Sequence, residues 1–332
     1  MVMHRDQRPS NVEIRADDHA LTGHAGLLLT GELAARTDLV VRLDRAIDAV
    51  RPFKQRRRGS SGGELLVSLA ELMTAGGDHL VHLDELREDE AGAELRAVSE
   101  VLAPTTAGQL MRRLNARQCQ AAVAELAKIG EEVDRQLGLT TTGPVTLDLD
   151  SFDSEVYGRL KQGAAFNYRG QRCYDTQMAT WAERRRILAA ELRSGNLNEH
   201  PTAIKVLRRA LAALPVVHGR VRARMDSGFE SVAIFEELRR REVGFTCSLK
   251  RTPALHRPRL ELPSRAWRPA LQMPRAEIAE TTYAPKGWRQ EPLRLIIRRV
   301  RIPVEELSAS ATRVLAQLSL RSCAVPRVAG GD

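Results

Sequence analysis

Two stretches of the sequence each place an aspartate at or near the end of an expected β-strand. In residues 145–151, apolar and polar side chains alternate, so Asp148 and Asp150 face away from the apolar side. Residues 216–226 form a second expected strand that ends at Asp226, and Gly228 breaks it before a helical pattern begins. Two carboxylates on rigid strands suit a divalent ion such as Mg²⁺, and such an ion supports phosphoryl transfer. A strand-end aspartate also serves commonly as a turn or helix cap, and that alternative stays open for each residue.

The first ligand has two candidates, because Asp148 and Asp150 lie on the same face of one strand. We prefer Asp150, since it lies where the strand meets the polar segment Ser151-Phe152-Asp153. Asp148 remains the alternative metal ligand. Asp153 and Glu155 follow directly and are candidates for groups that support the ligands from behind.

The chain is strongly basic, with 51 Lys and Arg against 42 Asp and Glu and a net charge of +9. Arginine dominates the basic set, and its planar guanidinium favours bidentate contacts with phosphate. Double-stranded DNA is the expected partner, although excess arginine also fits a solvated surface. The candidate DNA-contacting residues are Arg56, Arg57, Arg58, Arg112, Arg113, Arg117, Arg222 and Arg224.

Composition and motifs disfavour several other classes of protein. Four widely spaced cysteines and an N-terminus without an apolar signal core favour a cytoplasmic, nucleoid-associated protein over a secreted or membrane one. Neither a phosphate-binding loop nor a dinucleotide fingerprint occurs in the sequence. Aromatic residues make up only 4% of the chain, which argues against single-strand binding by base stacking. His79 and His82 lie one turn apart, but a surface or capping role is favoured because no third metal ligand is evident nearby.

The pattern of apolar residues divides the chain into four parts. Residues 1–21 are a polar lead-in, and residues 22–140 carry helical spacing, which suggests a DNA-binding and assembly region. Within it, we expect residues 104–114 to form a basic helix that presents Arg112 and Arg113, with Arg117, to a phosphate backbone. Residues 141–305 alternate strands with helices, which indicates an α/β domain. Residues 306–332 form a divergent tail.

Three motifs carry a resemblance to a known family: Leu147-Asp-Leu-Asp-Ser-Phe-Asp-Ser-Glu-Val-Tyr-Gly158, Lys161-Gln-Gly-Ala-Ala-Phe-Asn-Tyr-Arg-Gly170 and Arg224-Met-Asp-Ser-Gly-Phe229. Together they resemble the group-1 DDE transposases of bacterial insertion sequences, from about residue 22 to about residue 305. The resemblance implies a ribonuclease H-like catalytic domain, Mg²⁺ or Mn²⁺ as cofactor, and DNA strand transfer. It assigns Asp150 and Asp226 as the first and second catalytic acids. It also implies that the partners are the terminal repeats of an insertion sequence, bound by a homodimer on paired ends.

The third catalytic acid of that family, a glutamate on a late helix, has no evident match. Glu236, Glu237 and Glu242 come too early after Asp226, and no strong amphipathic helix frames Glu305 and Glu306. We therefore expect a C-terminally truncated transposase whose catalytic domain is incomplete. The alternatives are a remnant that only binds DNA and a free-standing Mg²⁺-dependent nuclease.

Overall fold

The computed structural model describes residues 21–56, 58–139, 142–197, 199–216, 218–250, 252, 255, 260–300 and 321–325, the last of these as backbone. The chain divides into two compact units at Ile129 and Gly130. This division falls inside a helix, earlier than the boundary at residue 140 that the sequence predicts. No helix among these residues is both long enough and apolar enough to cross a membrane.

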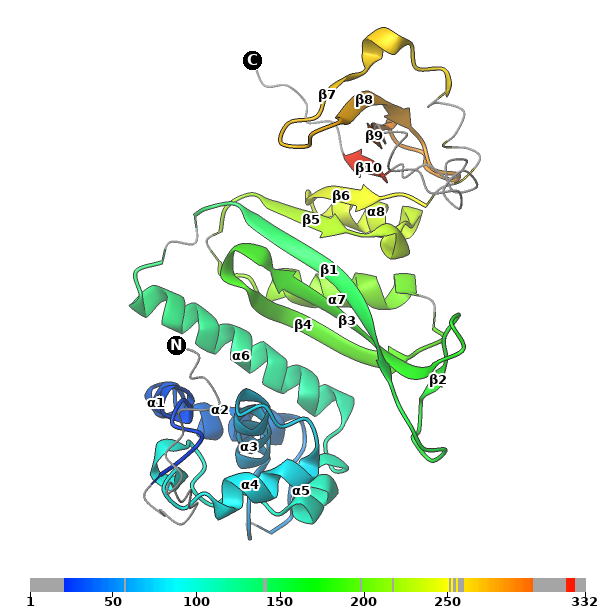
Figure 1. Cartoon of the computed structure of the whole chain (residues 1–332). Helices are drawn as coiled ribbons and strands as arrows, with labels where there is room; N and C mark the ends of the chain where they lie inside the picture. The colour runs from blue at the N-terminus through cyan, green and yellow to red at the C-terminus, as the bar shows by residue number, and fades with distance from the viewer. Residues whose placement is uncertain are drawn as a thin grey trace, which may run out of the picture. The chain divides into compact units, whose positions relative to one another are not determined.

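In the first unit, every described regular element is helical (Figure 1). The elements are α1 (Leu27–Arg36), α2 (Leu39–Val50), α3 (Gly62–Thr74), α4 (Leu83–Glu88), α5 (Pro104–Met111), α6 (Ala116–Gln136) and the 3-10 turns η2 (Leu80–His82) and η3 (Ala93–Leu95). Ile47, Leu65 and Leu83 are fully buried at the centre of this unit. Burial of such side chains is its main source of stability, at roughly 1.5–3 kcal/mol for each one.

The helical pattern at the start of the region 22–140 is interrupted at Asp38. This residue has a left-handed backbone, with a φ of 51°, which ends the first helix and redirects the chain into α2. The start of α3 is fixed by a reciprocal cap, in which Ser61 and Glu64 each accept a hydrogen bond from the other's backbone N–H. The signal that begins α3 thus lies in the basic, glycine- and serine-rich segment 55–63.

The basic helix expected over residues 104–114 is shorter than predicted. Helix α5 ends at Met111, and Arg112 is its C-cap. The side chains of Asn115 and Gln118 cap each other's backbone N–H groups, at 3.0 and 3.1 Å, and so start α6. Arg112 and Arg113 consequently lie in the turn between two helices, and Arg117 lies in the first turn of the next.

The described residues of the second unit contain a ten-stranded mixed sheet, which confirms the expected α/β architecture. Its strands are β1 (Val145–Glu155), β2 (Ala165–Phe166), β3 (Arg172–Trp181), β4 (Arg186–Ser194), β5 (Val221–Met225), β6 (Gly244–Ser248), β7 (Arg268–Pro269), β8 (Ala276–Tyr283), β9 (Leu293–Val300) and β10 (Arg321–Val325). Their order is β2-β3-β1-β5-β6-β10-β9-β8-β7, and β4 pairs with β3. Strand β1 is antiparallel to β3 and parallel to β5, and β5 is parallel to β6.

The segment expected to be a divergent tail contributes to this sheet. Strand β10 pairs antiparallel with both β6 and β9, so it joins β6 to the hairpin formed by β8 and β9. Sequence patterns alone did not reveal this pairing, because both of its partners are distant in the chain. The sheet therefore extends beyond residue 305, the end of the domain predicted from the sequence.

Two helices cross over between the central strands. Helix α7 (Glu199–Ala212) connects β4 to β5 and packs against β4, β3 and β1, and α8 (Val232–Arg240) connects β5 to β6 (Figure 1). Phe235 of α8 stacks on Phe245 of β6, with ring centroids 4.9 Å apart. Buried alternate residues on the central strands, such as Leu147 and Ala223, form the other side of this core.

Glu237 of α8 ties the two helices together. This buried carboxylate accepts hydrogen bonds from Arg208 of α7, at 2.8 and 3.0 Å, and from Arg240 and Arg241. These guanidinium groups, Arg208 first, hold the pKa of Glu237 far below its usual range. Because the folded-state pKa is depressed, the stabilisation is present above the unfolded pKa of about 4.3 and is lost as the pH falls further.

We expect Glu237→Gln to lower the free energy of unfolding by about 1–2 kcal/mol at pH 7, with solvent screening of the exposed arginines limiting the loss. The difference in the free energy of unfolding between variant and wild type should be smaller at pH 3, because the charged Glu237 of the wild type then stabilises the fold less. Urea unfolding at the two pH values measures this. Glu236→Gln, at the exposed neighbouring position, is the control. An equal gap at both pH values would contradict the assignment.

Candidate catalytic and DNA-binding site

Asp150 and Asp226 occupy equivalent positions on neighbouring parallel strands. The last paired residues of β1 and β5 are Leu149 and Met225, and each aspartate comes one residue later. The backbone of Asp226 is still extended, with φ −85° and ψ −176°. Neighbouring strands lie about 4.8 Å apart, so the two aspartates lie next to each other just beyond the last paired residues.

The carboxylates of both residues are exposed and only partly engaged. Oδ1 of Asp150 accepts the backbone N–H of Ser151 at 2.8 Å, and Oδ1 of Asp226 accepts that of Gly228 at 2.9 Å. Asp226 therefore does cap the 3-10 turn η5 (Ser227–Phe229). Within the described part of the chain, neither Oδ2 atom accepts a hydrogen bond. Two exposed carboxylate oxygens on adjacent strands fit the donor preference of Mg²⁺ or Mn²⁺.

Asp148 is engaged by an arginine. The guanidinium of Arg224, its partner in the register of β1 and β5, donates two hydrogen bonds to the Asp148 carboxylate, at 2.7 and 2.6 Å. This contact raises the pKa of Arg224. A bidentate pair of this kind occupies both oxygens of Asp148, which favours Asp150 as the metal ligand. It also means that Arg224, a candidate DNA contact, already has a carboxylate partner.

The exposed face of β5 leads toward Asp226 with a row of arginines. Val221, Ala223 and Met225 are buried, whereas the alternating Arg222 and Arg224 are exposed, as is Arg220 just before the strand. Residues two apart on a strand share a face, so these arginines lie on the same side of the sheet as Asp226. A phosphate backbone that follows this row would reach the two aspartates.

Asp153 and Glu155 are not positioned to hold the Asp150 and Asp226 carboxylates in place. They follow Asp150 by odd numbers of residues on β1, so their side chains point to the opposite face of the sheet. Asp153 instead accepts a hydrogen bond from the side-chain amide of Asn167 at 2.8 Å. Asp153 therefore links the end of β1 to the turn between β2 and β3.

A third acid does not join Asp150 and Asp226 among the described residues. No third His, Cys, Asp or Glu ligand atom from this part of the chain groups with theirs within 4.8 Å. Glu237 is engaged by arginines, and Glu242 lies after α8 in a left-handed backbone conformation. Glu305 and Glu306 lie outside the described residues.

The sequence decides which family this arrangement belongs to. The sequence model of the family described as transposase DDE domain, group 1, matches residues 4–320. The chain belongs to this family of DDE transposases. The match extends beyond both ends of the region, about residues 22–305, over which the resemblance runs in the sequence.

Solved transposase structures are distantly similar to this member of the DDE family. The piggyBac transposase synaptic complex with hairpin DNA is 12% identical, with a TM-score of 0.41, over 92% of this chain and 62% of that one. The Mos1 transposase paired-end complex with the left transposon end is 12% identical, with a TM-score of 0.22, over 58% of this chain and 61% of that one. This chain thus spans about three fifths of these two proteins. No curated protein matches it.

The other candidate DNA contacts of this DDE-family chain lie in the first unit. Arg56, Arg58, Arg112, Arg113 and Arg117 are all exposed, and Arg57 lies outside the described residues. The first two precede α3 and the other three surround the turn between α5 and α6. Their exposure leaves them accessible to phosphate, and their role in DNA binding stays a prediction.

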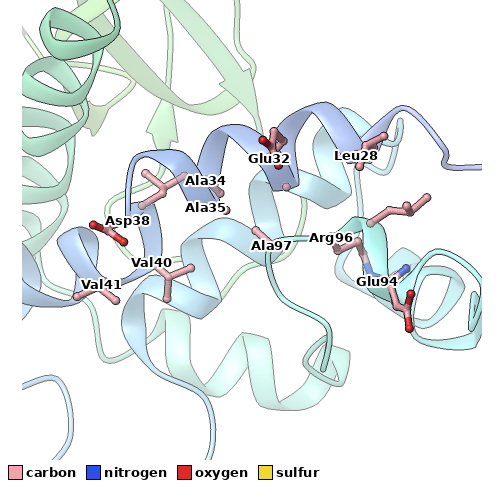
Figure 2. A pocket seen from close by; sticks show the side chains of 13 residues that line it. Leu28, Glu32, Ala34, Ala35, Asp38, Val40, Val41, Glu94, Arg96 and Ala97 are labelled. Atoms are coloured by element: carbon pink, nitrogen blue, oxygen red, sulfur yellow. The ribbon is translucent and has the colours of Figure 1, made fainter. Parts of the chain in front are cut away.

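The first unit also contains a hollow of about 390 Å³ between α1, the start of α2 and the segment around η3 (Figure 2). Three of its lining residues are carboxylates, Glu32, Asp38 and Glu94, against the single cation Arg96. Phosphate groups are repelled by such a lining. The hollow is therefore unsuited to the DNA backbone.

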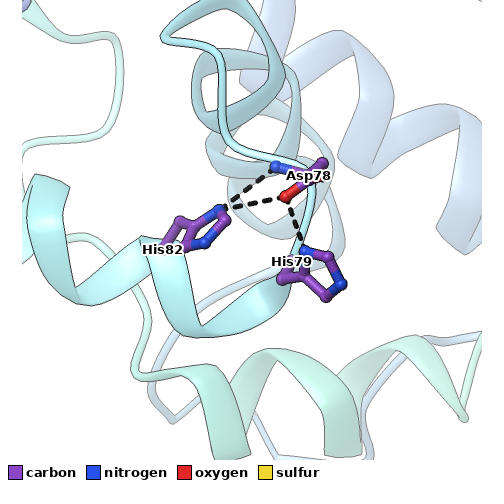
Figure 3. A group of neighbouring side chains, drawn as sticks. All are labelled: Asp78, His79 and His82. Carbon is purple, nitrogen blue, oxygen red and sulfur yellow. Dashed lines mark hydrogen bonds and ion pairs between the residues drawn. The ribbon is translucent and has the colours of Figure 1, made fainter.

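The carboxylate of Asp78 lies beside His79 and His82 and is a third possible metal ligand. Its Oδ1 lies 2.5 Å from Nδ1 of His79 and 3.3 Å from Nδ1 of His82 (Figure 3). The backbone N–H of Asp78 also donates to Nδ1 of His82 at 3.3 Å. Hydrogen bonding to His79 lowers the pKa of Asp78. Within the described residues, no side-chain hydrogen bond caps η2, so the capping role expected for these histidines is not seen, and the third ligand that the sequence did not reveal lies beside them.

Proposed function

We propose that this chain carries the catalytic core of a DDE-type transposase that cuts insertion-sequence DNA at its ends and transfers the strands to a target. The observation that carries the proposal is the placement of Asp150 and Asp226 side by side at one exposed edge of the sheet. Both belong to motifs of a family whose pattern spans residues 4–320.

We infer a ribonuclease H-like arrangement for the central strands. Strands β4, β3 and β1 are antiparallel neighbours, and β5 and β6 continue from β1 in parallel. Helices α7 and α8 form the two crossovers. This order supports the inference, because it sets the first strand in the middle, where its carboxylate can meet one from the next parallel strand.

The chemistry follows from what these residues can hold. A divalent ion, Mg²⁺ or Mn²⁺, bound between Asp150 and Asp226 would supply charge neutralisation for in-line displacement at a phosphodiester. Arg220 and Arg222, which are exposed on the face of β5 that leads to Asp226, would contact phosphates on one side of the scissile bond. The Asp148 carboxylate holds the Arg224 guanidinium in a fixed orientation beside the site.

The proposed partners are the terminal repeats of an insertion sequence, held as paired ends by two copies of the chain. The proposal is tested by incubating the purified chain with DNA that carries the element's own ends, in Mg²⁺ or Mn²⁺ and, as a control, in Ca²⁺. Cleavage at the ends supports a transposase. Cleavage without regard to the ends indicates a nuclease, and binding without cleavage indicates a protein that only occupies the ends.

DNA affinity should fall steeply with salt. For about six phosphate contacts, the logarithm of the association constant should decrease with a slope near −5 against the logarithm of the salt concentration. Fluorescence anisotropy with a labelled duplex measures this slope. Replacing Arg112 and Arg113 with Ala should reduce its magnitude by about 2, whereas an unchanged slope would remove the turn between α5 and α6 from the interface.

A further inference from the structure

Strand β1 continues beyond its pairing with β5 and leads into a structured arm. The pairing with β5 stops at Leu149, but β1 runs on to Glu155 alongside β3. Residues 151–172, which we call the arm, comprise the end of β1, the loop after it, β2 and the turn into β3 (Figure 1). The arm therefore begins one residue after Asp150.

The arm holds every exposed Phe and Tyr of the described chain. Phe152, Tyr157, Phe166 and Tyr168 are 49%, 78%, 65% and 86% exposed. The other residues of these two types are buried or half-buried: Phe53, Tyr174, Phe229, Phe235, Phe245 and Tyr283. Aromatic side chains bury well in cores, so their concentration on one projecting segment marks an interaction surface.

Polar contacts, rather than apolar packing, hold the arm in shape. Asn167 is 8% exposed, and its side-chain oxygen accepts the backbone N–H groups of Arg169 and Gln171, at 2.9 and 3.0 Å. Arg172 donates to the carbonyls of Gly158 and Lys161 across the loop. The rings are consequently displayed on an ordered backbone and are not needed for its folding.

The arm also presents positive charge next to its rings. Arg159, Lys161 and Arg169 are exposed. The guanidinium carbon of Arg169 lies 5.2 Å from the centre of the Tyr168 ring, and its Nε donates to the Tyr168 hydroxyl at 2.9 Å. Cations that can pair with phosphates, together with flat exposed rings, are the combination that binds unpaired nucleotides.

We propose that the arm binds unpaired nucleobases of the DNA by stacking them on Tyr157, Phe166 and Tyr168, at the end of β1 that lies beyond the scissile phosphate at Asp150. The proposal rests on the proposed function, which places DNA at Asp150. Phe152 shares a strand face with Asp150 and lies two residues away, about 7 Å along the strand, so the stacking surface begins beside the catalytic residue. The low aromatic content of the chain does not oppose this, because the exposed rings are gathered in one place.

The test compares two DNA probes of mixed sequence, a blunt duplex and the same duplex with a five-nucleotide single-stranded overhang that contains 2-aminopurine. Ca²⁺ replaces Mg²⁺ so that no strand is cut. The wild-type chain should bind the overhang at least fivefold more tightly than the blunt duplex and should quench the 2-aminopurine fluorescence. Tyr168→Ala and Tyr157→Ala should each weaken overhang binding about fivefold or more and reduce the quenching.

Matched variants separate stacking from charge and from folding. Leu160→Ala, at a 96% exposed apolar position in the same loop, should leave both signals unchanged, and Tyr168→Phe should retain them. Equal behaviour of Tyr168→Ala and Leu160→Ala, in chains with unchanged circular dichroism, would overturn the proposal. So would a wild-type chain that binds both probes equally, which would leave the proposed function standing. A chain that binds neither probe would contradict both the stacking proposal and the proposed function.

Discussion

Asp226→Asn should lower the rate of DNA strand cleavage by about a hundredfold to a thousandfold, while DNA affinity in Ca²⁺ stays within about twofold. The substitution keeps the size of the side chain and its hydrogen bond to Gly228, but it removes the negative charge that holds a divalent ion. Asp150→Asn should have an effect of similar size, because the two carboxylates leave neighbouring strands at the same register position. The measurement is single-turnover cleavage of labelled DNA in Mg²⁺ and in Mn²⁺.

Two further variants make this prediction specific. Glu155→Gln removes an exposed carboxylate on the same strand but on its other face, so cleavage should be unaffected. Asp148→Asn tests the alternative first ligand, and we expect a smaller loss, through release of Arg224. A full loss with Asp148→Asn and little change with Asp150→Asn would reverse our assignment of the first ligand. Unchanged cleavage with Asp226→Asn would remove the pair from the active site.

Arg193→Met should lower the free energy of unfolding by about 3–5 kcal/mol, the largest effect on stability that we expect from a change of one side chain. Arg193 and Asp175 form an ion pair between β4 and β3, and the two residues are 7% and 6% exposed. Burial raises the pKa of Asp175 in spite of the guanidinium beside it. Without Arg193 the carboxylate would be charged and buried with no cationic partner, which is costly.

The pH dependence and a double variant check this explanation. A carboxyl with a raised pKa takes up a proton more readily as the pH falls, so Arg193→Met should be less destabilised at pH 5 than at pH 8. Combining Arg193→Met with Asp175→Leu should recover most of the lost stability, because the lone charge is gone. Denaturant unfolding of the three chains measures both effects. A loss below about 1 kcal/mol for the single variant would mean that the pair contributes as little as a surface ion pair.

The sequence by itself determined the local parts of the candidate site. Alternation of apolar and polar residues fixed which side chains of β1 share a face, and the strand before Asp226 followed in the same way. The family resemblance also came from contiguous motifs, and it holds over residues 4–320. These features could be read because each depends on residues that are neighbours in the chain.

Only the tertiary structure decided how distant segments meet. It paired β1 with β5, joined Asp148 to Arg224 by hydrogen bonds and placed β10 between β6 and β9. It also left four aromatic rings that are close in the sequence exposed on the arm instead of buried in the core. Such outcomes depend on long-range pairing, and a carboxylate in the sequence has the same local pattern whether a metal ion, a guanidinium or a backbone N–H becomes its partner.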